Sequence, residues 1–343
     1  MIESKLTAPE PTEEDFVAEK SLRPTRLAEF IGQEEAVANM RVYIQSARKR
    51  NENLDHVLLF GPPGLGKTTL AYIIARELEV NVKSSSGPVL DRPADLAGIL
   101  TNLAERDVFF VDEIHRINNA VEEYLYAAME DYRIDIMLDK GPNARSVQLN
   151  LAPFTLIGAT TRLGNLTSPL RDRFGVVQRL DFYTAADLKQ VLLRSAELLE
   201  IALDEAAAEE IAQRARGTPR LANRILRRAR DFAEVDGSGH LTVEQARNAL
   251  LRLGIDEIGL DDMDRRILGL LVKNFGGGPV GVETLAVALH ESSRTIEEVY
   301  EPFLIKEGFL QRTQRGRVAT ERAYTYLKTA PLAAEGADQQ HLF

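Results

Sequence analysis

Eight residues near position 61 have the types and spacing needed to bind a nucleotide phosphate. Residues 61–68 read G-x-x-x-x-G-K-T, and the apolar run Val57–Phe60 comes directly before them. Gly64 and Gly66 let the backbone wrap closely around a phosphate, so that successive N–H groups point at it. Apolar residues then recur at helical spacing, and the start of a helix adds partial positive charge. Strand, glycine loop and helix together predict a P-loop.

The same pattern predicts which side chains act on the phosphates. Lys67 reaches the β- and γ-phosphates, and the Thr68 hydroxyl binds Mg²⁺. Asp112 and Glu113 follow a second apolar run, at the end of a predicted strand where parallel sheets bind ligands. We predict that Asp112 holds the Mg²⁺ shell and that Glu113 orients the attacking water. The alternative is an acidic pair at a helix start. We interpret His115 as structural.

A third predicted strand, residues 154–157, leads into Thr160 and Thr161. Their hydroxyls fall where they can contact the γ-phosphate or the water, although a turn or helix cap explains them equally well. Further on, Arg171 and Arg173 flank an aspartate, and their spacing alone assigns them no role.

The composition is typical of a globular protein without disulfides. The chain has 343 residues, a hydrophobic fraction of 44% and a net charge of -10. Its length indicates roughly two or three domains. It has no cysteine, which fits a reducing cytoplasm. We expect no signal peptide, because no basic segment precedes an apolar one. No run reaches the roughly 18 apolar residues of a membrane span. Residues 1–18 and 330–343 are expected to be flexible tails.

Three features follow or interrupt this core. Residues 132–151 alternate apolar and polar types around a Gly-Pro-Asn turn, which predicts a β-hairpin, either structural or a docking surface. Residues 184–254 show the apolar stripes of a helical bundle. Within it, residues 214–230 hold seven arginines and no acid. We interpret this run as a solvated face that borders DNA or a neighbouring subunit, except for Arg220, which starts a helix facing the nucleotide.

The C-terminal region predicts a DNA-binding module. From residue 257 the sequence reads as helix, glycine break, helix, turn and helix, followed by GFLQRTQRGRVAT at residues 308–320. Helix-turn-helix followed by a basic two-stranded ribbon indicates a winged helix. The ribbon carries three arginines and no acid, so we expect sequence-independent contacts with duplex phosphates from Arg312, Arg315 and Arg317. Arg294, at the start of the predicted recognition helix, is a weaker candidate. The alternative is a solvated hairpin.

The motifs GPPGLGKTT, FFVDEIHR, LIGATTR, LTSPLRDRFG and GTPRLANRILRR, in this order, resemble the AAA+ ATPases, and the chain is most similar to the RuvB family of Holliday-junction motors over about 90% of its length. The resemblance implies a parallel-sheet α/β core (1–183), a helical lid (184–254) and a winged-helix domain (257–343). It implies ATP and Mg²⁺ as cofactors, with Mg²⁺ on Thr68 and Asp112. The implied catalytic residues are Lys67, Asp112, Glu113, Thr161 as sensor 1, Arg173 as the arginine finger and Arg220 as sensor 2. The implied nucleotide contacts are Leu22, Arg23, Gly61, Gly64, Leu65, Gly66, Lys67, Thr68, Thr69, Glu130, Asp131, Tyr132, Arg173, Tyr183 and Arg220.

The resemblance also implies partners and a role. It implies hexameric rings on duplex DNA that drive branch migration in recombination, repair and the SOS response, with RuvA docked on the hairpin 132–151 and the RuvC resolvase in the larger complex. The first alternative is another DNA-acting AAA+ ATPase, such as a clamp-loader subunit or a replication initiator. The second is a winged-helix regulator that uses nucleotide only as a switch, which the presence of both Glu113 and Arg173 disfavours.

Overall fold

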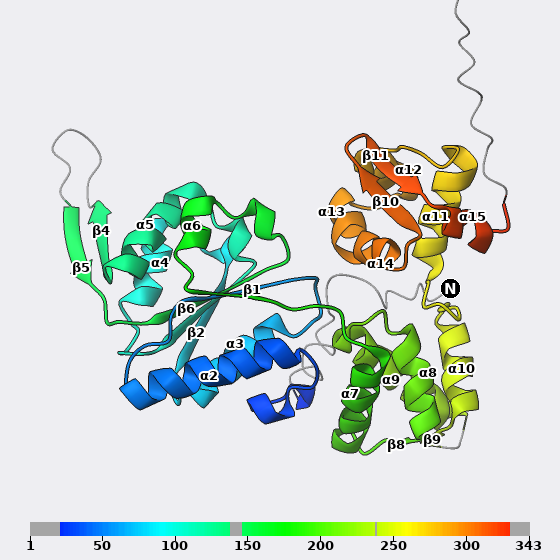
Figure 1. The fold of residues 1–343 in the computed structure, drawn as a ribbon, viewed down its shortest axis with the longest axis horizontal. Coiled ribbons are helices and arrows are strands. Elements are labelled where there is room, and N and C mark those ends of the chain that lie inside the picture. The colour runs from blue at the N-terminus through cyan, green and yellow to red at the C-terminus, as the bar shows by residue number, and fades with distance from the viewer. Residues whose placement is uncertain (1–20, 138–145, 237–238, 330–343) are drawn as a thin grey trace, which may run out of the picture.

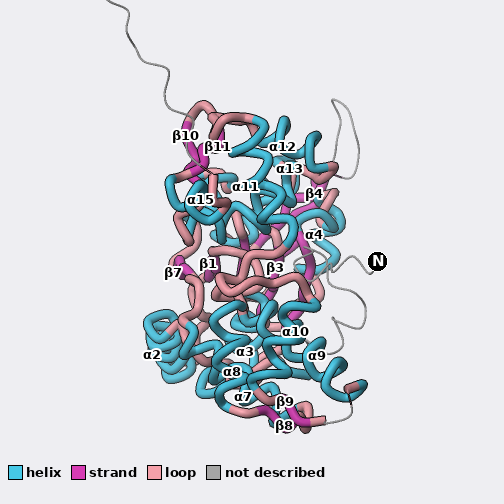
Figure 2. The backbone as a smooth tube through the Cα atoms, turned by 90° about the vertical axis from the view of Figure 1, so that its right-hand side faces the viewer, coloured by secondary structure: helices cyan, strands magenta, loops and turns pink. Residues whose placement is uncertain are grey.

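The computed structural model describes residues 21–137, 146–236 and 239–329. The expected tails and the hairpin turn at 139–145 lie outside these residues. The chain forms three parts: a sheet-containing core, a helical lid and a winged-helix head (Figure 1). In the view turned by 90°, the head and the lid lie at opposite ends, and the strands of the sheet appear at a level between them (Figure 2). No helix of the described residues is long and apolar enough to cross a membrane.

The core contains a parallel five-stranded sheet in the order β2-β3-β6-β1-β7. The predicted apolar runs form its three inner strands, β1 (Val57–Phe60), β3 (Val108–Asp112) and β6 (Thr155–Thr160). These strands are almost entirely buried, because helices cover both faces of the sheet. The edges are β2 (Val82–Ser86) and β7 (Val176–Arg179). The carboxyl ends of β1, β3 and β6 therefore lie side by side and bring the P-loop, the acidic pair and the two threonines together.

Two pairs of helices within the core cover the two faces of the sheet (Figure 1). Apolar residues of α2 (Glu34–Arg50) and α3 (Lys67–Glu77) pack on one face. Those of α4 (Pro93–Leu100) and α5 (Asn119–Glu130) pack on the other. The core also contains α6 (Ser168–Asp172) and the short 3-10 turns Leu27–Glu29, Gly87–Val89, Ile114–Arg116 and Leu163–Asn165. The expected hairpin is present as antiparallel β4 (Arg133–Met137) and β5 (Ser146–Asn150).

His56, just before β1, ties β6 to α5 in its neutral form. Its Nδ1 accepts a hydrogen bond from the Leu156 N–H at 2.9 Å, and its Nε2 lies 3.2 Å from the Met129 carbonyl oxygen. Burial lowers the pKa of His56 below its ordinary 6.5, and a proton on Nδ1 would face the Leu156 donor. The unfolded chain therefore binds this proton more readily. We expect the free energy of unfolding to fall as pH drops below about 6.5 and through the lower folded pKa.

Urea unfolding at pH 5.5 and 7.5 measures this effect when the parental protein is compared with His56→Gln. The variant is expected to lose about 1 kcal/mol at pH 7.5, the usual contribution of one buried hydrogen bond. It is also expected to depend less on pH between the two values. The same pH dependence in both proteins would contradict a neutral His56 in the folded state.

The lid is a four-helix bundle, as expected, formed by α7 (Ala185–Leu198), α8 (Glu205–Arg214), α9 (Pro219–Val235) and α10 (Val243–Arg252). A short parallel pair, β8 (Ala202–Leu203) with β9 (His240–Leu241), closes one end. The interpretation of the arginine run as a solvated face is wrong for Arg214, Arg216 and Arg224, which are buried. Arg216, for example, pairs with acids of the head, as described below.

The head has a hydrophobic core of its own, built from residues 260–324. Its elements are α11 (Asp262–Asn274), α12 (Val282–Leu289), α13 (Ser293–Thr295), the π-helical turn Ile296–Tyr300, α14 (Glu301–Lys306), β10 (Leu310–Thr313), β11 (Gly316–Ala319) and α15 (Glu321–Tyr326). The ribbon β10-β11 is antiparallel, and Val280 bridges to it at Arg317. This arrangement confirms the predicted winged helix.

Candidate nucleotide site

A cavity of about 620 Å³ lies where the core, lid and head meet. The P-loop and Asp112 form its floor, and the lid contributes the start of α9. The head contributes α13 and the turn that follows. The N-terminal segment closes one side with Leu22, Arg23 and Ile31. This volume is in the range of small-molecule sites, and three separate parts of the chain have to stay in place to form it.

The P-loop backbone has the geometry that its glycines predict. Gly61, Gly64 and Gly66 have φ values of +142°, +80° and +95°, which side chains with a Cβ adopt only at a cost. A Cβ on Gly61 would also collide with the carbonyl oxygen of Leu180. The loop then ends at the N-terminus of α3, whose free N–H groups favour an anion. This cradle fits a phosphate group.

Lys67, Thr68 and Asp112 meet at the bottom of the cradle. The buried Lys67 Nζ donates to the carbonyl oxygens of Gly61 and Pro62, at 2.8 and 2.7 Å. Burial lowers the pKa of Lys67 to about 8; Asp112 opposes this shift and Arg220 adds to it. The Thr68 hydroxyl donates to Asp112 Oδ2 at 3.0 Å. A hydroxyl beside a carboxylate at a phosphate cradle suits Mg²⁺, which takes few protein ligands and shares its other positions with phosphate and water.

Glu113 lies at the rim of the cavity in an unusual backbone conformation, with a φ of +47°. Its Oε2 accepts from Arg116 at 2.7 Å, and its Oε1 accepts from Arg294 of the head at 2.6 Å. Burial raises the pKa of Glu113, but the hydrogen bond from Arg116 and the charges of both arginines outweigh burial and lower it overall. A left-handed non-glycine residue beside the cradle is typical of a functional position.

The two threonines after β6 have different environments. The Thr160 hydroxyl lies 2.9 Å from His115 Nδ1, and it also accepts from the Arg162 N–H at 2.9 Å. The Thr161 hydroxyl lines the cavity and is buried without a hydrogen-bond partner among the described residues. Buried polar atoms are normally paired, so Thr161 fits a ligand with polar oxygens. His115 contacts Thr160, in agreement with a structural role.

The lid and the N-terminal segment are fixed against the P-loop. The Tyr183 hydroxyl donates to the Leu65 carbonyl oxygen at 3.3 Å, and burial raises the pKa of Tyr183. Arg194 of α7 donates to the Leu22 carbonyl oxygen at 2.9 Å. Arg220, at the start of α9, lines the cavity close to Gly64. Most of the residues expected to contact the nucleotide therefore line one cavity: Leu22, Arg23, Gly64, Gly66, Lys67, Thr68, Thr69, Tyr183 and Arg220.

Arg173 and the segment Glu130–Tyr132 are not among the residues that line this cavity. The Arg173 guanidinium lies 4.3 Å above the Tyr126 ring, pairs with Glu130 at 3.1 Å and donates to the Pro169 carbonyl oxygen at 2.7 Å. Within the described chain these residues therefore lie outside the cavity that the P-loop lines.

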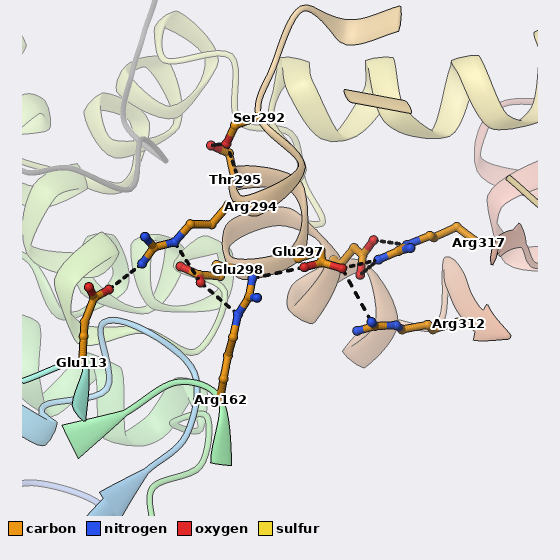
Figure 3. A network of polar contacts seen from close by, with 10 residues as sticks. Glu113, Arg162, Ser292, Arg294, Thr295, Glu297, Glu298, Arg312 and Arg317 are labelled. Carbon is orange, nitrogen blue, oxygen red and sulfur yellow. Dashed lines mark hydrogen bonds and ion pairs between the residues drawn. The ribbon is translucent and has the colours of Figure 1, made fainter. Parts of the chain in front are cut away.

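The arginines of the ribbon divide into two groups. Arg312 and Arg315 are exposed, and Arg312 lies 3.5 Å from Glu297. The expectation that Arg317 contacts DNA is corrected, because its side chain is only 7% exposed. It pairs with Glu301, and with Glu297 at 2.9 Å. Arg294 does not face away from the protein as a free recognition-helix residue, since it pairs with Glu113 (Figure 3).

The fold and this site define a P-loop ATPase of the AAA+ class that carries a winged-helix domain. Three family models match along the chain: the Holliday junction DNA helicase RuvB P-loop domain at residues 22–180, the RuvB AAA lid domain at 183–256 and the RuvB C-terminal winged helix domain at 257–328. The chain belongs to the RuvB family.

Named relatives agree with this assignment. Over 318 residues, the chain is 60% identical to the Holliday junction branch migration complex subunit RuvB of Myxococcus xanthus, covering 93% of each. It is 58% identical over 321 residues to the RuvB subunit of Salinibacter ruber, covering 94% of this chain and 93% of that one. The solved structure of the Thermotoga maritima RuvB Holliday junction branch migration motor matches with a TM-score of 0.84 and 49% identity, over 90% of this chain and 99% of that one.

Proposed function

We propose that this chain is the ATP-driven motor of Holliday-junction branch migration and that it moves duplex arms through rings of its own subunits. The observation that carries the proposal is a complete P-loop site whose cavity is partly walled by a winged-helix head. Membership of the RuvB family supports the junction as the substrate. We further propose the domain division 1–183, 184–254 and 257–343.

The proposed hydrolysis uses residues of the cavity in separate roles. The P-loop N–H groups and Lys67 bind and orient the phosphates. Thr68 and Asp112 hold Mg²⁺, which neutralises charge that develops on the phosphate oxygens. Glu113 accepts a proton from the attacking water. Thr161 positions the water or the γ-phosphate, and its unpaired hydroxyl supports that role.

The proposed assembly places Arg173 and the segment Glu130–Tyr132 at a subunit boundary. None of these residues lines the chain's own cavity, which supports a site shared between neighbours, and a finger supplied in this way makes hydrolysis depend on the ring. We propose a hexamer that works with RuvA, docked on the hairpin 132–151, and with RuvC in the larger complex. The relatives' names, which describe subunits of a branch migration complex, support a multiprotein assembly.

The ribbon is proposed to contact duplex phosphates through Arg312 and Arg315. A double charge reversal, Arg312→Glu with Arg315→Glu, is expected to weaken binding to duplexes of any sequence. It should also reduce the slope of log K against log salt by roughly two, because each lost phosphate contact removes about 0.9. Fluorescence anisotropy between 50 and 200 mM salt measures this. An unchanged slope would mean that the ribbon does not contact DNA.

Dissociation of a synthetic four-way junction tests the proposed function. The protein is incubated with the junction and ATP, with and without a RuvA partner, beside Glu113→Gln. ATP-dependent dissociation that the variant lacks is the expected result. An intact junction, together with ATPase activity that linear duplex still stimulates, would overturn branch migration and favour a clamp-loader or initiator type of AAA+ ATPase.

A further inference from the structure

A continuous series of ion pairs connects the ATP site to the ribbon of the head (Figure 3). Arg294 joins Glu113 at 2.6 Å to Glu298 at 3.1 Å. Arg162, the residue after Thr161, joins Glu298 at 3.0 Å to Glu297 at 3.1 Å. Glu297 in turn accepts from Arg317 at 2.9 Å. Three of these ion pairs therefore join the core to the head, and each involves Glu113 or Arg162, which lie beside residues of the nucleotide site.

We propose that Arg294 is an inhibitory restraint on Glu113, and that a DNA phosphate that takes Arg294 away releases the ATPase. The proposal rests on the role of Glu113 in the proposed function. The contact between Arg294 and Glu113 forms only when the head is docked. Hydrolysis would therefore respond to DNA through the Arg294 side chain.

The restraint follows from the hydrogen bonding of the Glu113 carboxylate. Arg116 and Arg294 each take one of its two oxygens. A carboxylate that accepts a proton from water needs an oxygen that is free to approach the water. Arg116 belongs to the core and stays with Glu113 wherever the head lies. Arg294 is the partner that can leave, and its departure frees Oε1.

Arg294 is held in place by its own helix and by the docked head. The Ser292 hydroxyl accepts from the Thr295 N–H at 2.9 Å and caps the turn that carries Arg294. Glu298, one helical turn further, orients the guanidinium and is itself held by Arg162 of the core. The Glu298 carboxylate contacts both Arg294 of the head and Arg162 of the core. Arg294 therefore reaches Glu113 only while the head stays docked on the core.

Release requires only that one side chain changes partner. Arg294 is 44% exposed, so its guanidinium is accessible to another anion. A phosphate binds a guanidinium through two parallel hydrogen bonds, and its charge is not already shared with a second arginine as that of Glu113 is. Since Arg294 cannot pair with Glu113 and a phosphate in the same geometry, DNA bound at this helix competes directly with the restraint.

Steady-state ATPase rates without DNA test the restraint. Arg294→Met, which keeps the aliphatic stem, is expected to raise the DNA-free rate by up to about five-fold, the upper end of the range for one partly exposed charged pair. Linear duplex should then stimulate it less than it stimulates the parental protein. Arg294→Lys keeps the charge and should raise the DNA-free rate less than Arg294→Met does. Arg266→Ala, which removes an exposed arginine of α11, is the matched control and should change nothing.

Equal or lower DNA-free rates for Arg294→Met, in rings shown intact by analytical ultracentrifugation, would overturn the proposal. Glu298→Gln provides a second variant, because it loosens Arg294 without touching Glu113. It should raise the rate about two-fold, and an unchanged rate would also count against the restraint. Failure of the proposed function has a different signature, since the parental protein would then leave four-way junctions intact whatever residue stands at position 294.

Discussion

An Arg173→Ala protein is expected to bind ATP with nearly parental affinity and to hydrolyse it about 10³-fold or more slowly, the effect typical of an arginine finger. Binding persists because Arg173 does not line the chain's own cavity. Hydrolysis fails because a neighbouring site loses the charge that stabilises its transition state. Isothermal titration with a non-hydrolysable ATP analogue and single-turnover hydrolysis measure the two effects separately.

The geometry of Arg173 explains why its loss should be so costly. Tyr126, Glu130 and the Pro169 carbonyl oxygen hold the guanidinium, while its buried Nε has no hydrogen-bond partner among the described residues. The side chain is thus held in place within its own chain. Preorganised charge of this kind stabilises a transition state without reorganisation when the reaction occurs.

Mixing two inactive proteins tests whether the finger acts between subunits. Arg173→Ala keeps a sound P-loop, and Lys67→Ala keeps a sound finger. In rings formed from equal amounts, up to about a quarter of the sites combine the two, because interfaces in a ring are head-to-tail. We expect the mixture to recover a measurable part of the parental rate. No recovery in rings that contain both proteins would mean that Arg173 acts within its own chain or only in folding.

Glu113→Gln is expected to lose about 10²- to 10⁴-fold in hydrolysis, the usual contribution of a positioned general base. Glutamine preserves the shape and keeps one oxygen that can accept a hydrogen bond from an arginine, but its amide cannot take the proton of the water. Nucleotide affinity should change little, because Lys67, Thr68 and the P-loop backbone remain in place.

Single-turnover hydrolysis beside nucleotide titration checks this second prediction. Glu35→Gln removes an exposed acid from the start of α2 and is the matched control, since that residue lies outside the cavity. A Glu113→Gln protein that hydrolyses ATP within ten-fold of the parental rate would remove Glu113 from the role of base. His115 would then need to be tested in its place.

The inner strands of the sheet could be predicted because they have one environment along their whole length. Residues 57–60 and 108–111 are apolar throughout, as expected of strands covered by helices on both faces. The edge strands gave no such signal. β2 reads VKSSS and β7 reads VVQR, and each pairs with a single neighbour. Their polar residues fit an edge, but a loop would fit the same composition.

At the site, short sequence motifs predicted the arrangement of the residues within them. They could not predict contacts between residues that are far apart in the sequence. The P-loop and the acidic pair are short contiguous motifs, whereas Glu113 and Arg294 are 181 positions apart and meet only in the folded chain. Arg317 was misinterpreted for a similar reason. Glu297 and Glu301, one turn apart on a preceding helical segment, turn it inward. Two acids four residues apart, on a helix that precedes a basic ribbon, could have predicted that one arginine of the ribbon pairs with them.

The joint between lid and head differs in kind from the contacts between head and core. Arg216 of the lid is buried against Asp261, at 3.0 Å, and Asp264, at 2.6 Å, where α11 begins. Removing one partner of a buried pair typically costs about 3–5 kcal/mol, against at most about 1 kcal/mol for an exposed pair. We therefore expect the lid and the head to move together as one body. A small rotation of the lid at the phosphates would then carry the ribbon over a longer distance.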